Sequence, residues 1–155
     1  MTPDIQPLQT ADEIEACAET MAATEPWITL RRGLDQCRRI MADPSRERYV
    51  ARIDGRFAGF VVVNMQGVFV GYIQILCVAP DCRNRGVGTA LLDFAERRIF
   101  RDSPNVFMLV SSFNHGAQRL YRRLGYEIVG ELKDFVVLGN SEILLRKTIG
   151  PLNPL

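Results

Sequence analysis

The stretch VAPDCRNRGVGTALLDFAE, residues 78–96, joins a strand to a helix through two arginines and two glycines. The residues before Pro80 have the pattern of a strand, and the apolar residues after Gly88 recur at helical spacing. The first turn of a helix has backbone N–H groups without internal partners and carries partial positive charge. Glycines let a ligand approach that backbone, and arginines supply forked donors for phosphate oxygens. The joint predicts an anion cradle suited to a pyrophosphate, against the simpler alternative of a tight turn with solvated arginines.

The composition is typical of one globular domain, and we expect that domain to span residues 1–155. Hydrophobic residues make up 47% of the chain, charged residues 24%, and the net charge is +1. This charge favours neither nucleic acid nor an acidic membrane surface as a partner. No apolar run reaches the roughly 20 residues of a membrane helix, and the N-terminus lacks the pattern of a signal peptide. With four cysteines, no C-x-x-C pair and one histidine, we expect a reduced, cytoplasmic protein without a metal site.

Periodicity and turn signals predict alternating strands and helices. We expect strands at 4–9, 68–78, 105–111, 126–132 and 135–149, a hairpin at 48–66 around Asp54-Gly55, and helices at 10–24, 34–41, 88–101 and 114–124. Thr10 and Glu13 have the spacing of a capping box at the start of the first helix. This order of elements predicts an α/β domain built around one mixed sheet.

Two familiar phosphate motifs do not fit the cradle. The dinucleotide fingerprint needs a third glycine where Leu91 stands, and the Walker loop needs a lysine that does not follow Gly88. The pattern that fits is R-x-x-G-x-G, here Arg83-Asn84-Arg85-Gly86-Val87-Gly88, preceded by Val78-Ala79-Pro80. This motif resembles the acetyl-CoA cradle of the GNAT superfamily of N-acetyltransferases. The expected order of elements is similar to that fold over nearly the whole chain.

The resemblance implies both a fold and an activity. The fold is a GNAT-type single α/β domain, with a central mixed, mostly antiparallel sheet flanked by about four helices. The activity is transfer of an acetyl group from acetyl-CoA to an amine by direct attack in a ternary complex, without a metal. The implied cofactor-binding residues are Leu76, Cys77, Val78, Arg83, Asn84, Arg85, Gly86, Val87, Gly88, Thr89, Asn114, Ala117 and Tyr121. The alternative is a non-catalytic domain that binds acyl-CoA as a sensor or regulatory module.

A second stretch, NHGAQRLYRRLGYE at residues 114–127, supports the resemblance. Asn114 and Tyr121 lie seven residues apart, which returns them to nearly the same helix face, with Ala117 between them. In GNAT enzymes the matching asparagine binds the pantetheine arm and the tyrosine protonates the departing thiolate, so the resemblance assigns these roles to Asn114 and Tyr121. The alternative is an N-cap asparagine and a half-buried core tyrosine. We expect His115 to point to solvent.

The predicted strand ending at Leu76-Cys77-Val78 matches the family's splayed fourth strand. The resemblance implies that the Val78 N–H stabilises the tetrahedral oxyanion of acyl transfer, which needs preorganised donors. We interpret Cys77 as a small core residue rather than a nucleophile, because direct transfer needs no acyl-cysteine. Cys82, in the cradle loop, could be exposed, but no neighbouring residue marks it as catalytic.

The sequence lacks the carboxylate that many relatives use to take the proton of the amine. The two usual positions hold Leu109 and the strand residues 72–74. Deprotonating a lysine-like amine at neutral pH costs about 4–5 kcal/mol, but an α-amine costs only about 1 kcal/mol. We therefore expect a solvent or water relay, ordered by Gln74 or Tyr72, while Glu25 or Glu142 could reach in from elsewhere.

The acceptor site is the least readable part of the sequence. In the superfamily it forms from the first two helices, their connection and the last hairpin, which points to Glu25, Trp27 and Phe135 as substrate-binding residues. Tyr72 and Gln74, on the predicted fourth strand, complete the expected set. Trp27 could wall an acceptor pocket or pack the helix pair against the sheet. The acceptor could be a protein N-terminus, a lysine, a polyamine, an amino sugar or another small amine. Acyl-chain preference and oligomeric state stay open, a homodimer included.

Overall fold

The computed structural model describes residues 2–154, which form one seven-stranded sheet and four α-helices. The strands are β1 (Asp4–Pro7), β2 (Glu47–Ile53), β3 (Arg56–Asn64), β4 (Tyr72–Val78), β5 (Asn105–Ser111), β6 (Glu127–Lys133) and β7 (Ser141–Thr148). The helices are α1 (Ala11–Ala22), α2 (Leu34–Ala42), α3 (Val87–Phe100) and α4 (His115–Arg123), with a short 3-10 turn at Pro80–Cys82. The sheet order is β1-β2-β3-β4-β5-β7-β6, and β4 with β5 is its parallel pair. The predicted α/β class and mostly antiparallel sheet are confirmed.

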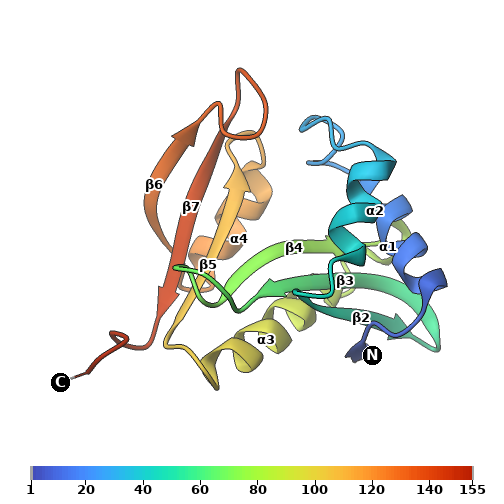
Figure 1. Cartoon of the computed structure of the whole chain (residues 1–155), viewed down its shortest axis with the longest axis horizontal. Coiled ribbons are helices and arrows are strands. Elements are labelled where there is room, and N and C mark those ends of the chain that lie inside the picture. Colours follow the sequence, from blue (N-terminus) through green and yellow to red (C-terminus); the bar gives the residue numbers. More distant parts are fainter. Residues whose placement is uncertain (1, 155) are drawn as a thin grey trace.

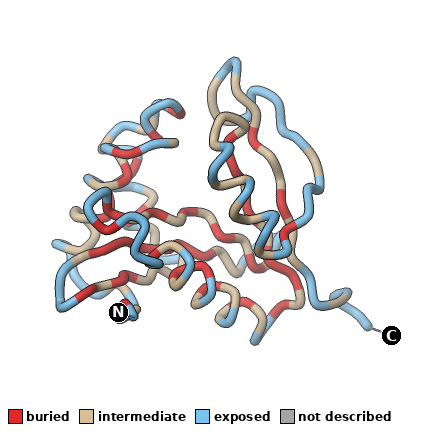
Figure 2. The backbone as a smooth tube through the Cα atoms, turned by 180° about the vertical axis from the view of Figure 1, so that it is seen from behind, coloured by how far each residue is buried: buried red, intermediate tan, exposed pale blue. Residues whose placement is uncertain are grey.

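Strand β3 is apolar at nearly every position because helices cover both faces of the sheet around it. Phe60 and Val62 pack with residues of α1 and α2, whereas Val61 and Val63 pack with residues of α3. Figure 1 shows α1 and α2 on one side of β2–β4 and α3 on the other. In Figure 2 the buried positions run along the central strands, while β6 is mostly exposed.

The sheet splits between its central strand, β4, and the neighbouring strand β5. These strands pair only at Tyr72 with Phe107 and at Ile73 with Met108. Beyond Ile73 they diverge, and in Figure 1 β5, β6, β7 and α4 stand apart from the layer formed by β2–β4. From residue 74 to residue 78, one edge of the β4 backbone therefore has no strand partner.

The capping box predicted for α1 is present. The Glu13 N–H donates to Thr10 Oγ1 at 3.2 Å, and the Thr10 N–H donates to Glu13 Oε2 at 3.4 Å. Together the two bonds satisfy amides that the helix itself leaves without partners.

Two predicted strands are wrong in their first parts. β4 begins at Tyr72 rather than at residue 68, and Val68 lies exposed in a loop that ends at Gly71. β7 begins at Ser141 rather than at residue 135, because residues 134–140 form a tight loop. In that loop Asp134 has a φ of +53°, and its side chain accepts a hydrogen bond from the Gly139 N–H at 2.7 Å. Before β4 and before β7, a run of apolar residues has the composition of a strand but lies in a loop.

Gly71 is the position in the fold where a side chain would be most costly. Its φ is +89°, and an added Cβ would overlap the Asn105 carbonyl oxygen and the Ile99 side chain. We expect Gly71→Ala to destabilise the protein by about 2–5 kcal/mol, from left-handed strain and overpacking together. Gly67→Ala is the matched control, because Gly67 has a φ of +83° with no atom within 4 Å of an added Cβ. Equal denaturant midpoints for the two variants would contradict this account.

Candidate active site

The R-x-x-G-x-G stretch forms the turn into α3. Gly86 is the N-cap residue, with φ 80° and ψ 5°, and within the described chain no side chain caps this end of the helix. The N–H groups of the first turn of α3 therefore stay available to a ligand. Val87 is buried, which anchors the turn, whereas Arg83 and Asn84 are exposed.

A cavity of ≈ 550 Å³ lies between this turn, the end of β4 and α4, and we call it the cradle cavity. The predicted cofactor residues that line it are Leu76, Cys77, Val78, Arg83, Asn84, Gly86, Val87, Gly88, Thr89, Asn114, Ala117 and Tyr121. The structure thus brings together every residue of the predicted cofactor set except Arg85. That side chain is exposed and lies outside the lining of the cavity.

The backbone of β4 presents a free edge to the cradle cavity. The Ala79 N–H donates to the Ala58 carbonyl oxygen on the β3 side, at 2.9 Å. Because successive N–H groups of a strand point to opposite edges, the Val78 N–H points to the edge where β5 has diverged. Val78 also lines the cradle cavity, so its N–H is placed to donate to a bound group.

A second cavity of ≈ 200 Å³ adjoins the first and lies between the two halves of the sheet. Its walls come from the α1–α2 connection, β4, β5, α4, β7 and the loop before β7. Both cavities are lined by Pro26, Trp27, Leu76, Asn114, Ala117 and Tyr121. A ligand in the cradle cavity would therefore meet a ligand in the second cavity beside Tyr121.

Tyr121 and Asn114 each have a polar group free at this junction. The Tyr121 hydroxyl has no hydrogen-bond partner among residues 2–154, and burial raises its pKa, so the phenol keeps its proton at neutral pH. Asn114 Oδ1 accepts the Ala117 N–H at 3.2 Å and caps α4. This leaves the Asn114 amide nitrogen as a donor. The N-cap interpretation is confirmed, and it is compatible with ligand binding.

Glu142 on β7 supplies a carboxylate inside the second cavity. The residue is 5% exposed, and Ser111 Oγ on β5 donates to its two oxygens at 2.9 and 3.2 Å. Burial raises the pKa of Glu142, while the Ser111 hydrogen bond and the positive charge of Arg32 partly offset the rise. Leu109 on β5, where many relatives have a carboxylate, lines the same cavity. In this chain the carboxylate of the cavity comes instead from Glu142 on β7, the strand that pairs with β5.

Tyr72, Gln74 and Arg32 complete the polar lining of the second cavity. Burial raises the pKa of Tyr72 to about 12; the negative charge of Glu142 adds to the rise and the positive charge of Arg32 opposes it. These groups are therefore close enough to act on one another. Sequence reasoning missed Arg32, which stands in an arginine pair of a loop with no motif around it.

The other predicted substrate residues surround the cavities in different ways. The Glu25 carboxylate accepts from the Thr29 N–H and hydroxyl at 3.2 and 2.9 Å, and it lines only the cradle cavity. Trp27 lines both cavities and also packs against α1, α2 and the sheet, so its packing role is confirmed, whereas its role in an acceptor pocket stays a prediction. Phe135 is exposed at the outer wall of the second cavity. His115 is exposed and lines neither cavity.

The two cysteines near the cradle cavity are buried thiols. Cys77 is 2% exposed, and burial raises its pKa to about 12, which disfavours the thiolate that a nucleophile requires. The expectation that Cys82 could be exposed is wrong, because the residue is only 6% exposed. The 3-10 turn at Pro80–Cys82 directs Cys82 into the core that α3 shares with the sheet.

Within residues 2–154, no three histidine, cysteine, aspartate or glutamate side chains gather in a way that would hold a metal ion. None of the described helices combines the length and the apolar character needed to cross a membrane.

Comparisons with known proteins agree with this geometry. The family model for the acetyltransferase (GNAT) family matches residues 8–126. An uncharacterized N-acetyltransferase of Methanocaldococcus jannaschii is 36% identical over 101 residues, which are 64% of this chain and 64% of that protein. An acetyltransferase of Pectobacterium atrosepticum is 32% identical over 95 residues, which are 61% of this chain and 64% of that protein. The match thus spans less than two thirds of the length of either relative.

Solved structures share the fold over nearly the whole chain. A crystal structure of an aminoglycoside 6'-N-acetyltransferase complexed with coenzyme A superposes with a TM-score of 0.75 at 18% sequence identity. The alignment covers 96% of this chain and 98% of that one. At this identity, the likeness supports the fold alone.

Proposed function

Because the chain belongs to the GNAT acetyltransferase family, we propose that it transfers an acetyl group from acetyl-CoA to an amine by direct attack. The observation that carries the proposal is the junction of the two cavities beside Tyr121. A thioester held in the cradle cavity and an amine in the second cavity would meet there. The cytoplasmic location and a homodimer stay predictions.

The cradle cavity offers the groups that acetyl-CoA needs. The free N–H groups of residues 86–89 suit the pyrophosphate, and Arg83 adds a forked donor at the rim. The Asn114 amide nitrogen and the free edge of β4 can donate to and accept from the amide groups of the pantetheine arm. The coenzyme A complex of the structurally similar aminoglycoside acetyltransferase supports this choice of cofactor.

The residues of the second cavity can move the protons of the reaction. Glu142 takes a proton from the ammonium group of the acceptor, and the amine nitrogen then attacks the thioester carbonyl carbon. The Val78 N–H donates to the oxyanion that forms. When the C–S bond breaks, Tyr121 donates its proton to the sulfur, and the nitrogen, which still carries an extra proton after the attack, gives that proton back to Tyr121 through solvent. Glu142 releases its proton to solvent, and the products are an amide and the free thiol of coenzyme A.

Glu142 also bears on the non-catalytic alternative. The apparent lack of a carboxylate was the feature that favoured an acyl-CoA sensor. A buried carboxylate in the lining of the second cavity weakens that support.

Gly86 tests the cradle. An alanine there keeps open space around its Cβ but must adopt a φ of +80° to preserve the turn. Left-handed strain of about 1–2 kcal/mol should raise the Kd for acetyl-CoA roughly 5- to 30-fold in titration calorimetry. Gly67→Ala carries similar strain in a loop that lines neither cavity, and should bind acetyl-CoA normally. An unchanged Kd for a folded Gly86→Ala variant would show that this turn does not bind acetyl-CoA.

The function is tested by release of free thiol from acetyl-CoA in the presence of an amine panel. The panel holds an N-terminal peptide, a lysine peptide, a polyamine, an amino sugar and small monoamines. We expect thiol release that depends on at least one of these amines. Tight acetyl-CoA binding without amine-dependent release would favour the sensor instead.

A further inference from the structure

The second cavity carries two opposite charges that no described group neutralises by a direct ion pair. Glu142 is buried on β7, and its nearest partner is the neutral Ser111 hydroxyl. Arg32 lines the same cavity from the α1–α2 connection. Within residues 2–154 the ion pairs include neither side chain.

Arg32 is held at this place by its backbone. Its N–H donates to the Trp27 carbonyl oxygen at 3.0 Å, and its own carbonyl oxygen accepts from the Cys37 thiol at 3.6 Å. The side chain is half-buried, and its charge acts on both Tyr72 and Glu142. A half-buried guanidinium without an anion has donors left for a ligand.

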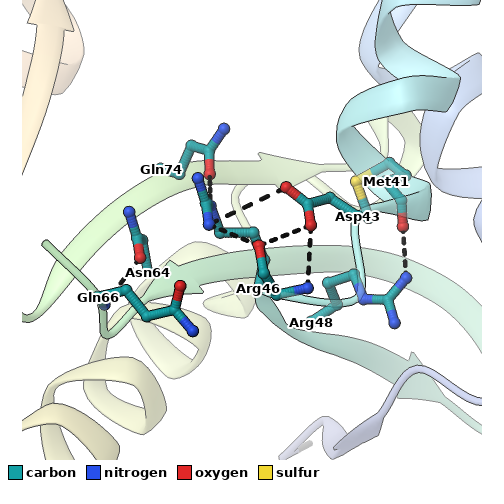
Figure 3. Close-up of polar contacts among 8 residues, drawn as sticks. Met41, Asp43, Arg46, Arg48, Asn64, Gln66 and Gln74 are labelled. Atoms are coloured by element: carbon teal, nitrogen blue, oxygen red, sulfur yellow. Dashed lines mark hydrogen bonds and ion pairs between the residues drawn. The ribbon is translucent and has the colours of Figure 1, made fainter.

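Gln74 adds a further donor to the cavity. Arg46 Nε, which can only donate, is 3.0 Å from Gln74 Oε1, so this oxygen is already engaged (Figure 3). Arg46 also donates to Ser45 Oγ at 2.8 Å. The Gln74 amide nitrogen donates to no described residue, so Gln74 offers the cavity N–H groups rather than an acceptor.

The groove outside the cavity carries positive charge as well. Leu30, Arg32, Phe135 and Val136 line both the second cavity and this groove, and Arg31 lies along the groove. No carboxylate stands among the described residues that line the groove. An acceptor with several positive charges, such as a polyamine, would hold its further charges close to two arginines if it extended from Glu142 along this groove.

We propose that the acceptor is a small amine that also carries a carboxylate or a phosphate, with Glu142 facing its amine and Arg32 and Gln74 binding its anionic group. This inference rests on the proposed function and names the substrate class of the same site. Arginine suits both anions because its fork binds two oxygens at once.

Matched acceptor pairs test the inference. O-Phosphoethanolamine is compared with ethanolamine, and β-alanine with β-alaninamide, each kcat/KM being expressed per total amine at neutral pH, because Glu142 receives the ammonium form of the acceptor. The anionic member should have the higher value by roughly 10- to 100-fold, as expected for hydrogen bonds to a charged group. A preference for the anionic member in the first pair alone identifies the anionic group of the acceptor as a phosphate. A preference in the second pair alone identifies it as a carboxylate, and either result supports the inference.

Arg32 variants assign the preference to one side chain. Arg32→Ala should collapse the ratio within each pair, mainly by raising KM for the anionic member, and Arg32→Lys should restore part of it. Arg39→Ala is the matched control, because Arg39 is exposed on α2 outside the two cavities and the groove. This variant should keep the wild-type ratio.

The outcomes separate the two proposals. Thiol release from neutral amines without an anionic preference would overturn the inference and keep the acetyltransferase. Two further results would overturn the inference and keep the acetyltransferase. One is an equal loss of kcat/KM for both members of a pair in Arg32→Ala, and the other is turnover confined to peptides or polyamines. No thiol release with any amine would overturn both.

Discussion

Glu142→Gln is expected to lower kcat/KM for every acceptor by about 10²–10⁴-fold, the usual contribution of a general base. Glutamine has nearly the same shape, and its carbonyl oxygen can still accept the Ser111 hydroxyl that holds Glu142 at 2.9 Å. The fold and the Kd for acetyl-CoA should therefore change little. What is lost is the capacity to take a proton from the acceptor in the second cavity.

The pH profile identifies this base independently of the size of the loss. A base must be deprotonated to act, so kcat/KM should rise with pH through the pKa of Glu142. Because burial raises that pKa, the bend should lie above the ordinary glutamate value of about 4.3. The bend should stay in place when the acceptor is changed, and Glu142→Gln should abolish it.

Glu131→Gln is the control for this pair of measurements, since Glu131 is exposed on β6 and lines neither cavity. The competing outcome is the water relay expected from the sequence. In that case kcat/KM would climb toward the pKa of each acceptor, the bend would move with the acceptor, and Glu142→Gln would leave the profile unchanged.

Tyr121→Phe is expected to lower turnover by about 10²–10⁴-fold while acetyl-CoA binding persists. Phenylalanine keeps the edge-on packing against Tyr126, whose ring centroid is 5.9 Å away. The lost hydroxyl bonds to no described residue, so the free energy of unfolding should change little. The loss should appear in kcat because the leaving sulfur no longer receives a proton.

Tyr126→Phe is the matched control for Tyr121. It removes a hydroxyl that donates to Glu96 Oε1 at 2.8 Å, outside both cavities. We expect it to reduce stability by about 1 kcal/mol and to keep wild-type turnover. Wild-type turnover in Tyr121→Phe, with chemistry limiting the rate, would reduce Tyr121 to a core residue.

The parts of the site that sequence predicted lie in continuous segments. The cradle was predictable from R-x-x-G-x-G at a strand–helix joint. The groups at the junction of the two cavities were predictable from the spacing of Asn114 and Tyr121 on one helix. In both cases local geometry sets which groups share a face. The element order was predictable for the same reason, because periodicity and turn signals act over short distances.

The second cavity could not be derived in the same way. Glu142 reaches it because β7 pairs with β5 and places Glu142 opposite Ser111, a register that no local pattern reveals. Arg32 reaches it because the α1–α2 connection lines the cavity together with residues of β4 and β5. The loop at residues 134–140 was mistaken for strand because its apolar residues outweighed the turn formed by Asp134 and Gly139. The positions of Glu142 and Arg32 and the loop at residues 134–140 therefore depend on strand pairing and loop geometry, which local sequence patterns do not reveal.

The central claim is that an acetyl group passes from acetyl-CoA to an amine bound in the second cavity. It is tested most directly by supplying acetyl-CoA with an isotopic label in the acetyl carbonyl, together with the best amine of the panel, and following the label by NMR. The account predicts that the label appears in an amide of that amine, in equal amount with free coenzyme A thiol. Label that stays in the thioester, or that leaves only as acetate while acetyl-CoA binds, would contradict the account.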